Sequence, residues 1–250
     1  MLLKIENQTE LIDTLQLKQI GEGKDGKIYK LGNSALKLTE SGYMTEEKAK
    51  DLIKAIPPNR NNRLIIPKNI VYNPKSIKIS GSYSMAGYTS ELVNINNEIS
   101  TMTSEEYLNE MMYLWVQIEK YFSHNKIAIT DINAQNLLSS IVDGEKRIFL
   151  IDHDRNITPS CNALEKEIIK DDYSKFNEKK FALLMYSGIL YQVFKLAKIK
   201  KANSKDLNNY IEEELNRKNT TLSNTEKVLS GFDTIQEYAE VTLKKIKKRK

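Results

Sequence analysis

The 250-residue sequence has few cysteines, prolines and tryptophans, and it has no long apolar run. Its one cysteine, Cys161, excludes an internal disulfide and is compatible with a reducing compartment. We therefore expect a cytoplasmic protein, although delivery into another cell would leave the same composition. No run approaches the ~18–20 apolar residues of a membrane helix, which predicts no transmembrane segment. The two histidines, His124 and His153, lie far apart in the sequence and argue against a zinc site.

Positive charge is concentrated at the C-terminal end of the sequence. The formal net charge is +5, and six of the last seven residues are basic, so the rest of the chain carries −1. The sequence therefore gives no strong nucleic-acid signal. The basic tail, residues 244–250, is typical of a solvated helix C-terminus, where cations complement the helix dipole. A weak contact with an anionic partner or membrane surface is the alternative.

Strand patterns dominate the first third of the chain. They predict strands over residues 15–20, 27–30, 34–38, 64–72 and 76–85. A helix is predicted over residues 45–56, because two prolines follow it. The glycines of residues 21–26 lie between two strands, whereas a dinucleotide-binding glycine motif opens a helix, so a Rossmann domain is excluded. Residues 86–89 predict a linker.

Helical patterns dominate the rest of the chain. Thr103 and Glu106 form a capping-box pattern at the start of a helix. That helix carries an apolar stripe at helical spacing, consisting of Tyr107, Met111, Leu114, Trp115, Ile118 and Phe122. Residues 177–198 predict a second long helix, apolar nearly all round and therefore buried. Two or three amphipathic helices are expected after residue 204.

Oxygen-bearing side chains gather in two neighbouring segments of the second half. Asp131 and Asn136 lie five residues apart, and Asp152 follows the apolar run of residues 148–151. Such side chains suit Mg²⁺, which is usually shared between one or two carboxylates and substrate phosphates. Upstream lie the glycines and Lys37 in an apolar strand. A phosphate cradle plus a metal site is the equipment for phosphoryl transfer.

Each of these motifs also has an ordinary structural explanation. A glycine-rich segment is more often a plain turn, a strand lysine commonly faces solvent, and an Asp–Asn pair can cap a turn. The order of the motifs along the chain favours the functional interpretation: glycine hairpin, lysine strand, acidic helix, long helix, Asp–Asn pair, apolar strand and a final aspartate.

In this order the motifs resemble the protein-kinase-like superfamily, over about residues 15–200. The glycine-rich loop is matched by Gly21, Gly23, Gly26 and the aliphatic Ile28. Lys37 is similar to the lysine that holds the α- and β-phosphates of ATP. Glu47, with Glu46 as competitor, fits the helix carboxylate that pairs with this lysine. Residues 84–87, with Met85, fall where the hinge would meet adenine.

The resemblance implies a bilobal α+β fold that binds ATP and Mg²⁺. Residues 1–86 would form a small antiparallel-sheet N-lobe with one helix, and residues 87–250 a mainly helical C-lobe with the basic tail. Asp131 would accept or orient the proton of the attacking hydroxyl. Asn136 and Asp152 would hold the metal ion.

Several positions depart from the superfamily pattern and leave the acceptor open. Ile129-Thr130 stands where His-Arg or His-Gly is usual, and Asn133 where protein-specific members often carry a lysine. His153-Asp154-Arg155 lacks the usual Phe and Gly. Asp154 would be a second carboxylate at the metal or part of an exposed salt bridge with Arg155 or a nearby lysine.

A protein Ser/Thr hydroxyl is the first expectation for the acceptor. A small molecule of the aminoglycoside or choline type is the alternative. A nucleotide-binding regulator without transfer, or transfer of AMP, also fits the sequence.

Overall fold

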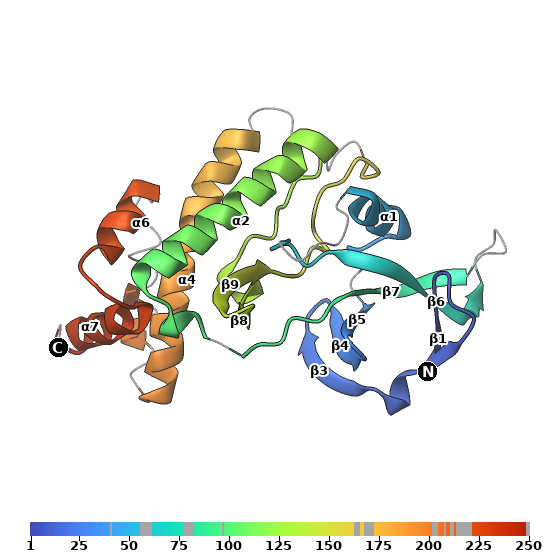
Figure 1. Cartoon of the computed structure of the whole chain (residues 1–250), viewed down its shortest axis with the longest axis horizontal. Coiled ribbons are helices and arrows are strands. Elements are labelled where there is room, and N and C mark those ends of the chain that lie inside the picture. The colour runs from blue at the N-terminus through green and yellow to red at the C-terminus, as the bar shows by residue number, and fades with distance from the viewer. Residues whose placement is uncertain are drawn as a thin grey trace. The chain divides into compact units, whose positions relative to one another are not determined.

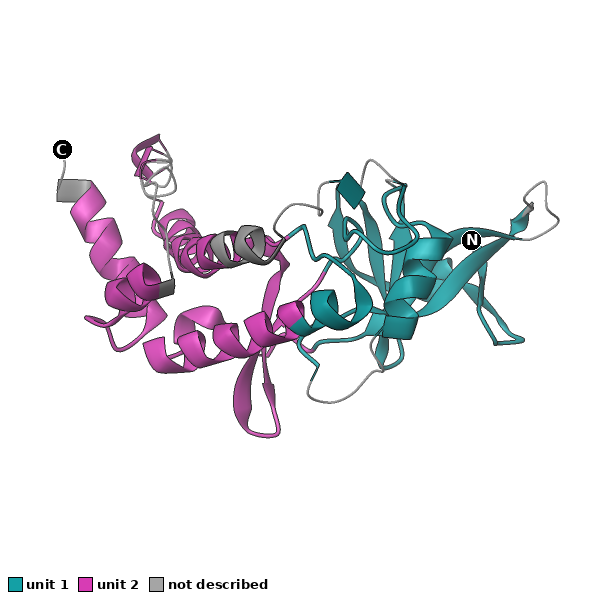
Figure 2. Ribbon diagram, turned by 90° about the horizontal axis from the view of Figure 1, so that it is seen from above, with its two compact units in different colours: residues 1–93, 120–131, 152–169 teal, residues 94–119, 132–151, 170–250 magenta. Residues whose placement is uncertain are grey.

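The computed structural model describes residues 1–250 except 41, 56–61, 78–82, 97, 163–165, 168–172, 202–204, 208, 211–212, 214–221 and 249–250. The chain divides into two compact units, drawn in teal and magenta in Figure 2. Unit 1 comprises Met1–Val93, Lys120–Asp131 and Asp152–Ile169, and unit 2 comprises Asn94–Glu119, Ile132–Ile151 and Lys170–Lys250. The predicted boundary after residue 86 therefore differs from the structure, in which two later segments also belong to unit 1.

Unit 1 is built on one antiparallel sheet of seven strands, in the order β2-β1-β6-β7-β5-β4-β3. Figure 1 shows that this sheet is strongly curled. Its strands are β1 (Leu2–Ile5), β2 (Leu11–Asp13), β3 (Lys18–Gly23), β4 (Gly26–Leu31), β5 (Ser34–Thr39), β6 (Pro67–Ile77) and β7 (Tyr83–Glu91). The short helix η1 (Thr14–Gln16) follows β2, and α1 (Glu46–Ala55) packs on β6. The predicted α+β class with an antiparallel N-terminal sheet and one helix is confirmed.

Alternation along the strands gives the sheet its core. Leu36 and Leu38 of β5 point to one face, where they pack with Leu3, Ile5 and Val71 in a buried cluster. Lys37 lies between the two leucines and therefore points to the opposite face. The alternation of side chains along β5 thus places Lys37 on the sheet face opposite the Leu36 and Leu38 cluster.

The predicted linker at residues 86–89 is wrong, because these residues lie inside strand β7. The stretch Ala-Gly-Tyr-Thr has the small residues of a linker, but Gly87, Tyr88 and Thr89 each pair with both neighbouring strands. Gly87 is buried opposite Leu38 of β5, and a Cβ there would overlap the carbonyl oxygen of Lys37. The glycine therefore serves close strand approach instead of flexibility.

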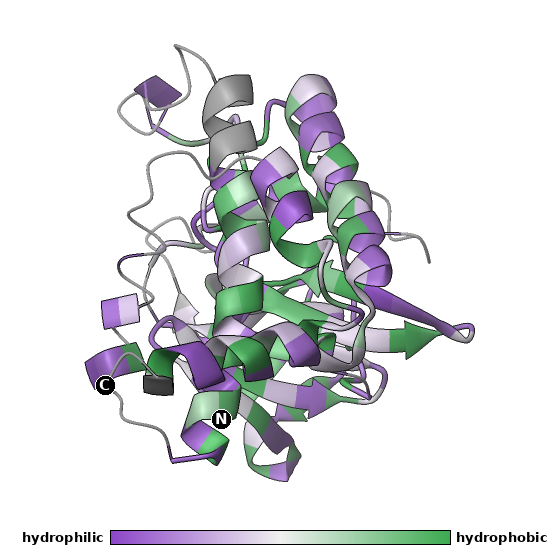
Figure 3. Ribbon diagram, turned by 90° about the vertical axis from the view of Figure 1, so that its left-hand side faces the viewer, coloured by the Kyte–Doolittle hydropathy of each residue, from purple (hydrophilic) through white to green (hydrophobic). Residues whose placement is uncertain are grey.

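Unit 2 is mainly helical and contains one small hairpin. Its elements are η2 (Ile99–Thr101), α2 (Ser104–Asn125, of which the part from Lys120 belongs to unit 1), η3 (Ala134–Asn136), β8 (Leu137–Val142), β9 (Glu145–Leu150), α4 (Tyr173–Ile199), α6 (Leu222–Leu229) and α7 (Ile235–Lys248). Helix α4 packs against α6, α7 and η3. The helical ribbons in Figure 3 are banded in hydrophilic and hydrophobic colours, as expected of amphipathic helices.

Helix α2 begins with the predicted capping box. The backbone amide of Glu106 donates to the Thr103 hydroxyl over 3.0 Å, and the amide of Thr103 donates to the Glu106 carboxylate over 2.8 Å. These hydrogen bonds and the nearby Lys146 ammonium hold the pKa of Glu106 below its usual value. The predicted apolar stripe is buried from Tyr107 to Ile118, and Phe122 is half-buried.

Helix α4 confirms the predicted buried helix. Phe181 and Ile189 are fully buried, and the Tyr107 hydroxyl of α2 donates to the carbonyl of Met185 over 2.7 Å. One part of α4, Lys180–Ile199, is long and apolar enough to cross a membrane by length and composition. Lysines, a serine and a glutamine interrupt this stretch, so it is not a run of consecutive apolar residues, and the absence of a transmembrane segment stays a prediction. The buried side chains of α4 account for the apolar composition.

The C-terminal region contains α6 and α7, in line with the expected amphipathic helices. Helix α7 runs to Lys248, and Lys244 and Lys245 are exposed along it. The last two residues of the basic tail lie outside the described residues.

Thr103→Ala tests the capping box. We expect a loss of about 1 kcal/mol in the free energy of unfolding, because one helix amide loses its side-chain acceptor. Chemical denaturation at neutral pH measures this loss. Thr103→Ser keeps the hydroxyl and is the matched control. Equal stability of the alanine and serine variants would contradict the assignment.

Candidate functional site

A buried lysine with two carboxylates forms the most unusual polar cluster in unit 1. The Lys37 Nζ lies 2.7 Å from Oδ1 of Asp152 and 2.9 Å from Oδ2 of Asp154. The Tyr88 hydroxyl donates to the other oxygen of Asp154 over 2.8 Å. Lys37 is 7% exposed and Asp154 is fully buried. Buried charges are costly unless paired, so this cluster is held together by its own ion pairs.

The sheet register brings the cluster together. Gly21 of β3 pairs with Ile28 of β4, Ile28 pairs with Lys37 of β5, and Lys37 pairs with Tyr88 of β7. Residues directly opposite each other on antiparallel strands share one face of the sheet. Three residues predicted for ATP binding, Gly21, Ile28 and Lys37, therefore form one row across neighbouring strands, with Tyr88 at its end.

The charges within the cluster oppose and support one another. Burial by itself lowers the pKa of Lys37, but the carboxylates of Asp154 and Asp152 outweigh it, so the pKa lies above its ordinary value. Burial raises the pKa of Asp154, and the Lys37 charge offsets only part of this effect. Burial also raises the pKa of Tyr88 well above its ordinary value, with the Asp154 charge adding to it. Tyr88 is therefore a hydrogen-bond donor at neutral pH.

The two aspartates of the cluster differ in backbone and exposure. Asp152 has a φ of 63° in the left-handed region, which few non-glycine residues adopt and which costs of order 1–3 kcal/mol. Its side chain is 27% exposed, whereas that of Asp154 is fully buried. Asp152 is therefore the carboxylate that a ligand from solvent can reach.

Arg155 connects two further acidic residues in unit 1. Its guanidinium lies 3.5 Å from the Asp25 carboxylate in the β3–β4 turn and 4.0 Å from the Asp131 carboxylate. The same group lies over the Tyr43 ring, 4.5 Å from its centroid. The Arg155 carbonyl accepts a hydrogen bond from Thr130 over 2.6 Å. The segment after Asp152 thus lies beside both the turn of the glycine hairpin and Asp131.

The predicted glycines lie in the β3–β4 hairpin, and the sheet requires only one of them. Gly26 has a φ of 148°, and a Cβ there would overlap the carbonyl of Leu38. At Gly23 an added Cβ would meet nothing within 4 Å, and at Gly21 it would make ordinary contact with Ile28. Packing therefore does not require glycine at position 23, and its predicted role in the glycine-rich loop stays a prediction.

Two residues predicted to bind the nucleotide lie elsewhere than expected. Glu47 is exposed on α1, and among the described residues the ion pairs of Lys37 are with Asp152 and Asp154 instead. Glu46 contacts Lys50 and Tyr72. Met85 lies within β7 opposite Tyr72 of β6, so it is part of a paired strand and not a hinge. The chain passes from unit 1 to unit 2 only after Val93.

The predicted metal ligands do not all belong to one unit. Asn136 ends the turn η3 of unit 2, which Asn133 caps, and its carbonyl accepts a hydrogen bond over 2.9 Å from the amide of Ile151, the residue before Asp152. Asp131 and Asp152 both belong to unit 1. Across the described part of the chain, no three His, Cys, Asp or Glu side chains form a group able to hold a metal ion. The roles of Asn136 and Asp152 at a metal ion stay a prediction.

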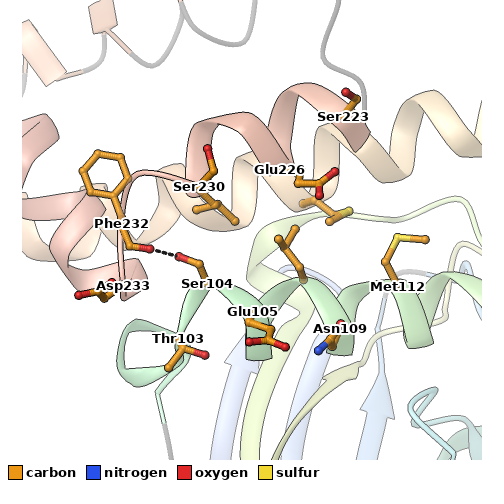
Figure 4. A pocket seen from close by; sticks show the side chains of 13 residues that line it. Thr103, Ser104, Glu105, Asn109, Met112, Ser223, Glu226, Ser230, Phe232 and Asp233 are labelled. Atoms are coloured by element: carbon orange, nitrogen blue, oxygen red, sulfur yellow. Dashed lines mark hydrogen bonds between the residues drawn. The ribbon is translucent and has the colours of Figure 1, made fainter.

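A pocket of about 880 Å³ lies in unit 2 between α2, α6 and the turn before α7. Figure 4 shows its acidic and polar rim, which includes Glu105, Asn109 and Glu226. The Ser104 hydroxyl donates to the Phe232 carbonyl at one end over 2.8 Å. None of the residues predicted for nucleotide or metal binding lines this pocket.

Sequence reasoning missed Tyr88, Arg155 and the role of Asp154. Asp154 was expected at a metal or in an exposed salt bridge, but it is buried and paired with Lys37 and Tyr88. Tyr88 lies in the segment predicted to be a linker, and strand pairing with β5 places it opposite Lys37.

Comparisons with known proteins find similar solved structures but no match by sequence. No family model matches the chain, and no curated protein matches it by sequence. The chain is similar to the solved structure of the Cydia pomonella granulovirus kinase PK-1, with 14% identity, 68% coverage of each chain and a TM-score of 0.45. A similarity with this identity and TM-score concerns only the backbone fold.

The two glycines Gly87 and Gly23 give a matched test of the sheet. Gly87→Ala would force β5 and β7 apart, and we expect a loss of about 1–3 kcal/mol in the free energy of unfolding. Gly23→Ala has free space and should leave stability unchanged. Denaturation of both variants measures the difference, and equal losses would contradict the described strand approach.

Proposed function

We propose that the chain is an ATP- and Mg²⁺-dependent phosphotransferase that moves the γ-phosphoryl group to a hydroxyl, in the first place of a protein Ser or Thr. One observation carries the proposal: Lys37 is buried and ion-paired to Asp152 on the sheet face that also bears Ile28 of the glycine hairpin. A buried ammonium beside an accessible carboxylate suits a phosphate and its metal ion.

The hairpin and Lys37 would bind the triphosphate. A Cβ added at Gly23 would meet nothing within 4 Å, so a phosphate can approach the backbone there, and the Lys37 ammonium supplies a positive charge. Because its pKa lies above the ordinary value, this charge is present at every physiological pH. Lysine is a usual point-charge partner of phosphate.

The residues present fit a magnesium ion shared with ATP. Lys37, Asp152 and Asp154 together carry one positive and two negative charges when ionised, so a polyanion needs a cation at this point. Asp152 would hold Mg²⁺, since its side chain is partly exposed. Mg²⁺ typically takes only one or two protein carboxylates when phosphates complete its shell. When bound, the ion would neutralise charge on the transferring phosphoryl group.

Asp131 would orient the acceptor hydroxyl and take its proton. Its carboxylate is 28% exposed and lies in the same unit as Lys37. A carboxylate within hydrogen-bond reach of a hydroxyl can accept its proton as the bond to phosphorus forms. The guanidinium of Arg155 lies 4.0 Å from this carboxylate and would have to move away when the acceptor hydroxyl binds.

Labelled ATP tests the proposal directly. Incubation with γ-labelled ATP, Mg²⁺ and cell lysate should label an acceptor, and Lys37→Met and Asp131→Asn should each reduce labelling by at least about a hundredfold. The matched control is Asp143→Asn, which changes an aspartate in the β8–β9 turn of unit 2. Equal labelling by wild type and Asp131→Asn would refute the assigned chemistry. Transfer of α-label would indicate movement of AMP, and labelling of metabolites alone would indicate a small-molecule acceptor.

A nucleotide-binding regulator without transfer is the second candidate. The contacts of Arg155 with Asp131 and Asp25 favour it, because they engage the carboxylate that would accept the proton. Thermal stabilisation by ATP and Mg²⁺ without any label transfer would support this candidate. Arg155→Ala distinguishes the two, since it should raise turnover only if Asp131 is catalytic.

A further inference from the structure

We propose that Asp154 is the positioning residue of Lys37 and that α1 supplies no direct carboxylate partner to this lysine. Asp154, in the segment after Asp152, would then take the role predicted for Glu47 of α1, which is to pair with Lys37 and fix its position. The inference rests on the proposed function only in so far as Lys37 contacts a nucleotide. The assignment of the ion pair itself rests on the geometry.

The contacts of Asp154 make it a permanent partner of Lys37. Its side chain is fully buried, and its two oxygens take the Lys37 ammonium at 2.9 Å and the Tyr88 hydroxyl at 2.8 Å. Both partners are fixed by strand pairing, because Lys37 and Tyr88 lie opposite each other on β5 and β7. If this carboxylate moved away, the buried Tyr88 hydroxyl would lose its acceptor and Lys37 would lose one of its two counter-charges.

Asp152 has the opposite character. It is the more exposed of the two aspartates, and its left-handed φ of 63° costs energy that the bond to Lys37 helps to offset. A metal ion can therefore draw Asp152 away while Lys37 keeps its bond to Asp154. In this proposal the two carboxylates have different roles: Asp154 positions Lys37, and Asp152 binds the metal ion.

The acids of α1 are engaged elsewhere. Glu47 is exposed, and Glu46 contacts Lys50 at 2.7 Å and the Tyr72 hydroxyl at 3.3 Å. In the described part of the chain, neither of these two glutamates contacts Lys37 directly, whereas Asp51 of α1 accepts a hydrogen bond from the Ser160 amide over 2.9 Å and so ties the helix to the segment after Asp152. The consequence is a site in which Lys37 is positioned by the sheet and by the segment after Asp152, without a direct carboxylate partner from α1.

Nucleotide binding gives the first test, with ATP as the probe and magnesium chloride titrated. Asp154→Asn should weaken ATP affinity at saturating Mg²⁺ by about tenfold to a hundredfold, because Lys37 loses a charge-assisted bond and its position. It should leave the Mg²⁺ midpoint unchanged. Asp152→Asn should instead shift that midpoint upward. Tyr88→Phe should have a smaller effect in the direction of Asp154→Asn.

Glu47→Gln is the matched control on α1 and should bind ATP as wild type does. A loss of affinity in Glu47→Gln with none in Asp154→Asn would overturn the inference. So would a shift of the Mg²⁺ midpoint in Asp154→Asn as large as that in Asp152→Asn. General destabilisation would not separate the two midpoints, so a purely structural role of Asp154 predicts a different outcome.

A double-mutant cycle tests the pair without any ligand. Lys37→Met strands a buried carboxylate, so it should lower the melting temperature, and adding Asp154→Asn should restore part of that loss. Combining Lys37→Met with Glu47→Gln should show no such recovery. Additive effects of Lys37→Met and Asp154→Asn would refute the pair. If wild type binds no ATP, the proposed function fails while this cycle still decides the inference.

Discussion

The burial of one lysine is the constraint on which unit 1 depends. Strand β5 must keep Leu36 and Leu38 on the core face, and the alternation then forces Lys37 under the sheet. A buried ammonium needs counter-charges, and the chain supplies Asp152 and Asp154 from a segment far along the sequence. The ion pairs therefore hold that segment against the sheet and place its two carboxylates beside Lys37.

The close approach of β7 to β5 is part of the same arrangement around Lys37. Gly87 lets this strand approach β5, and the approach sets Tyr88 opposite Lys37 so that its hydroxyl reaches Asp154. A larger residue at position 87 would move the hydroxyl as well as the strand. Gly87 therefore affects both the packing of β5 against β7 and the position of the Tyr88 hydroxyl, which links the stability of the sheet to the geometry of the site.

Local patterns were enough to predict the elements whose signals lie within a few residues. Helix α1 before its prolines, the capping box of Thr103 and Glu106, and the buried helix α4 all follow from short-range rules. Lys37, Asp131 and Asp152 were likewise predicted, and all three lie in unit 1. The segment around Tyr88 was misread, because only pairing with β5 shows that its small residues form a strand.

The order of the chemical groups along the chain, from the glycine hairpin to Asp152, was readable before any folding was considered, since motif spacing is a property of the covalent chain. The partner of Lys37 was not. Glu47 had the expected spacing on a helix, yet Asp152 and Asp154 pair with Lys37, because a buried ammonium is stabilised by the carboxylates that lie beside it in the fold, whatever their distance in sequence. Three-dimensional packing alone made that choice.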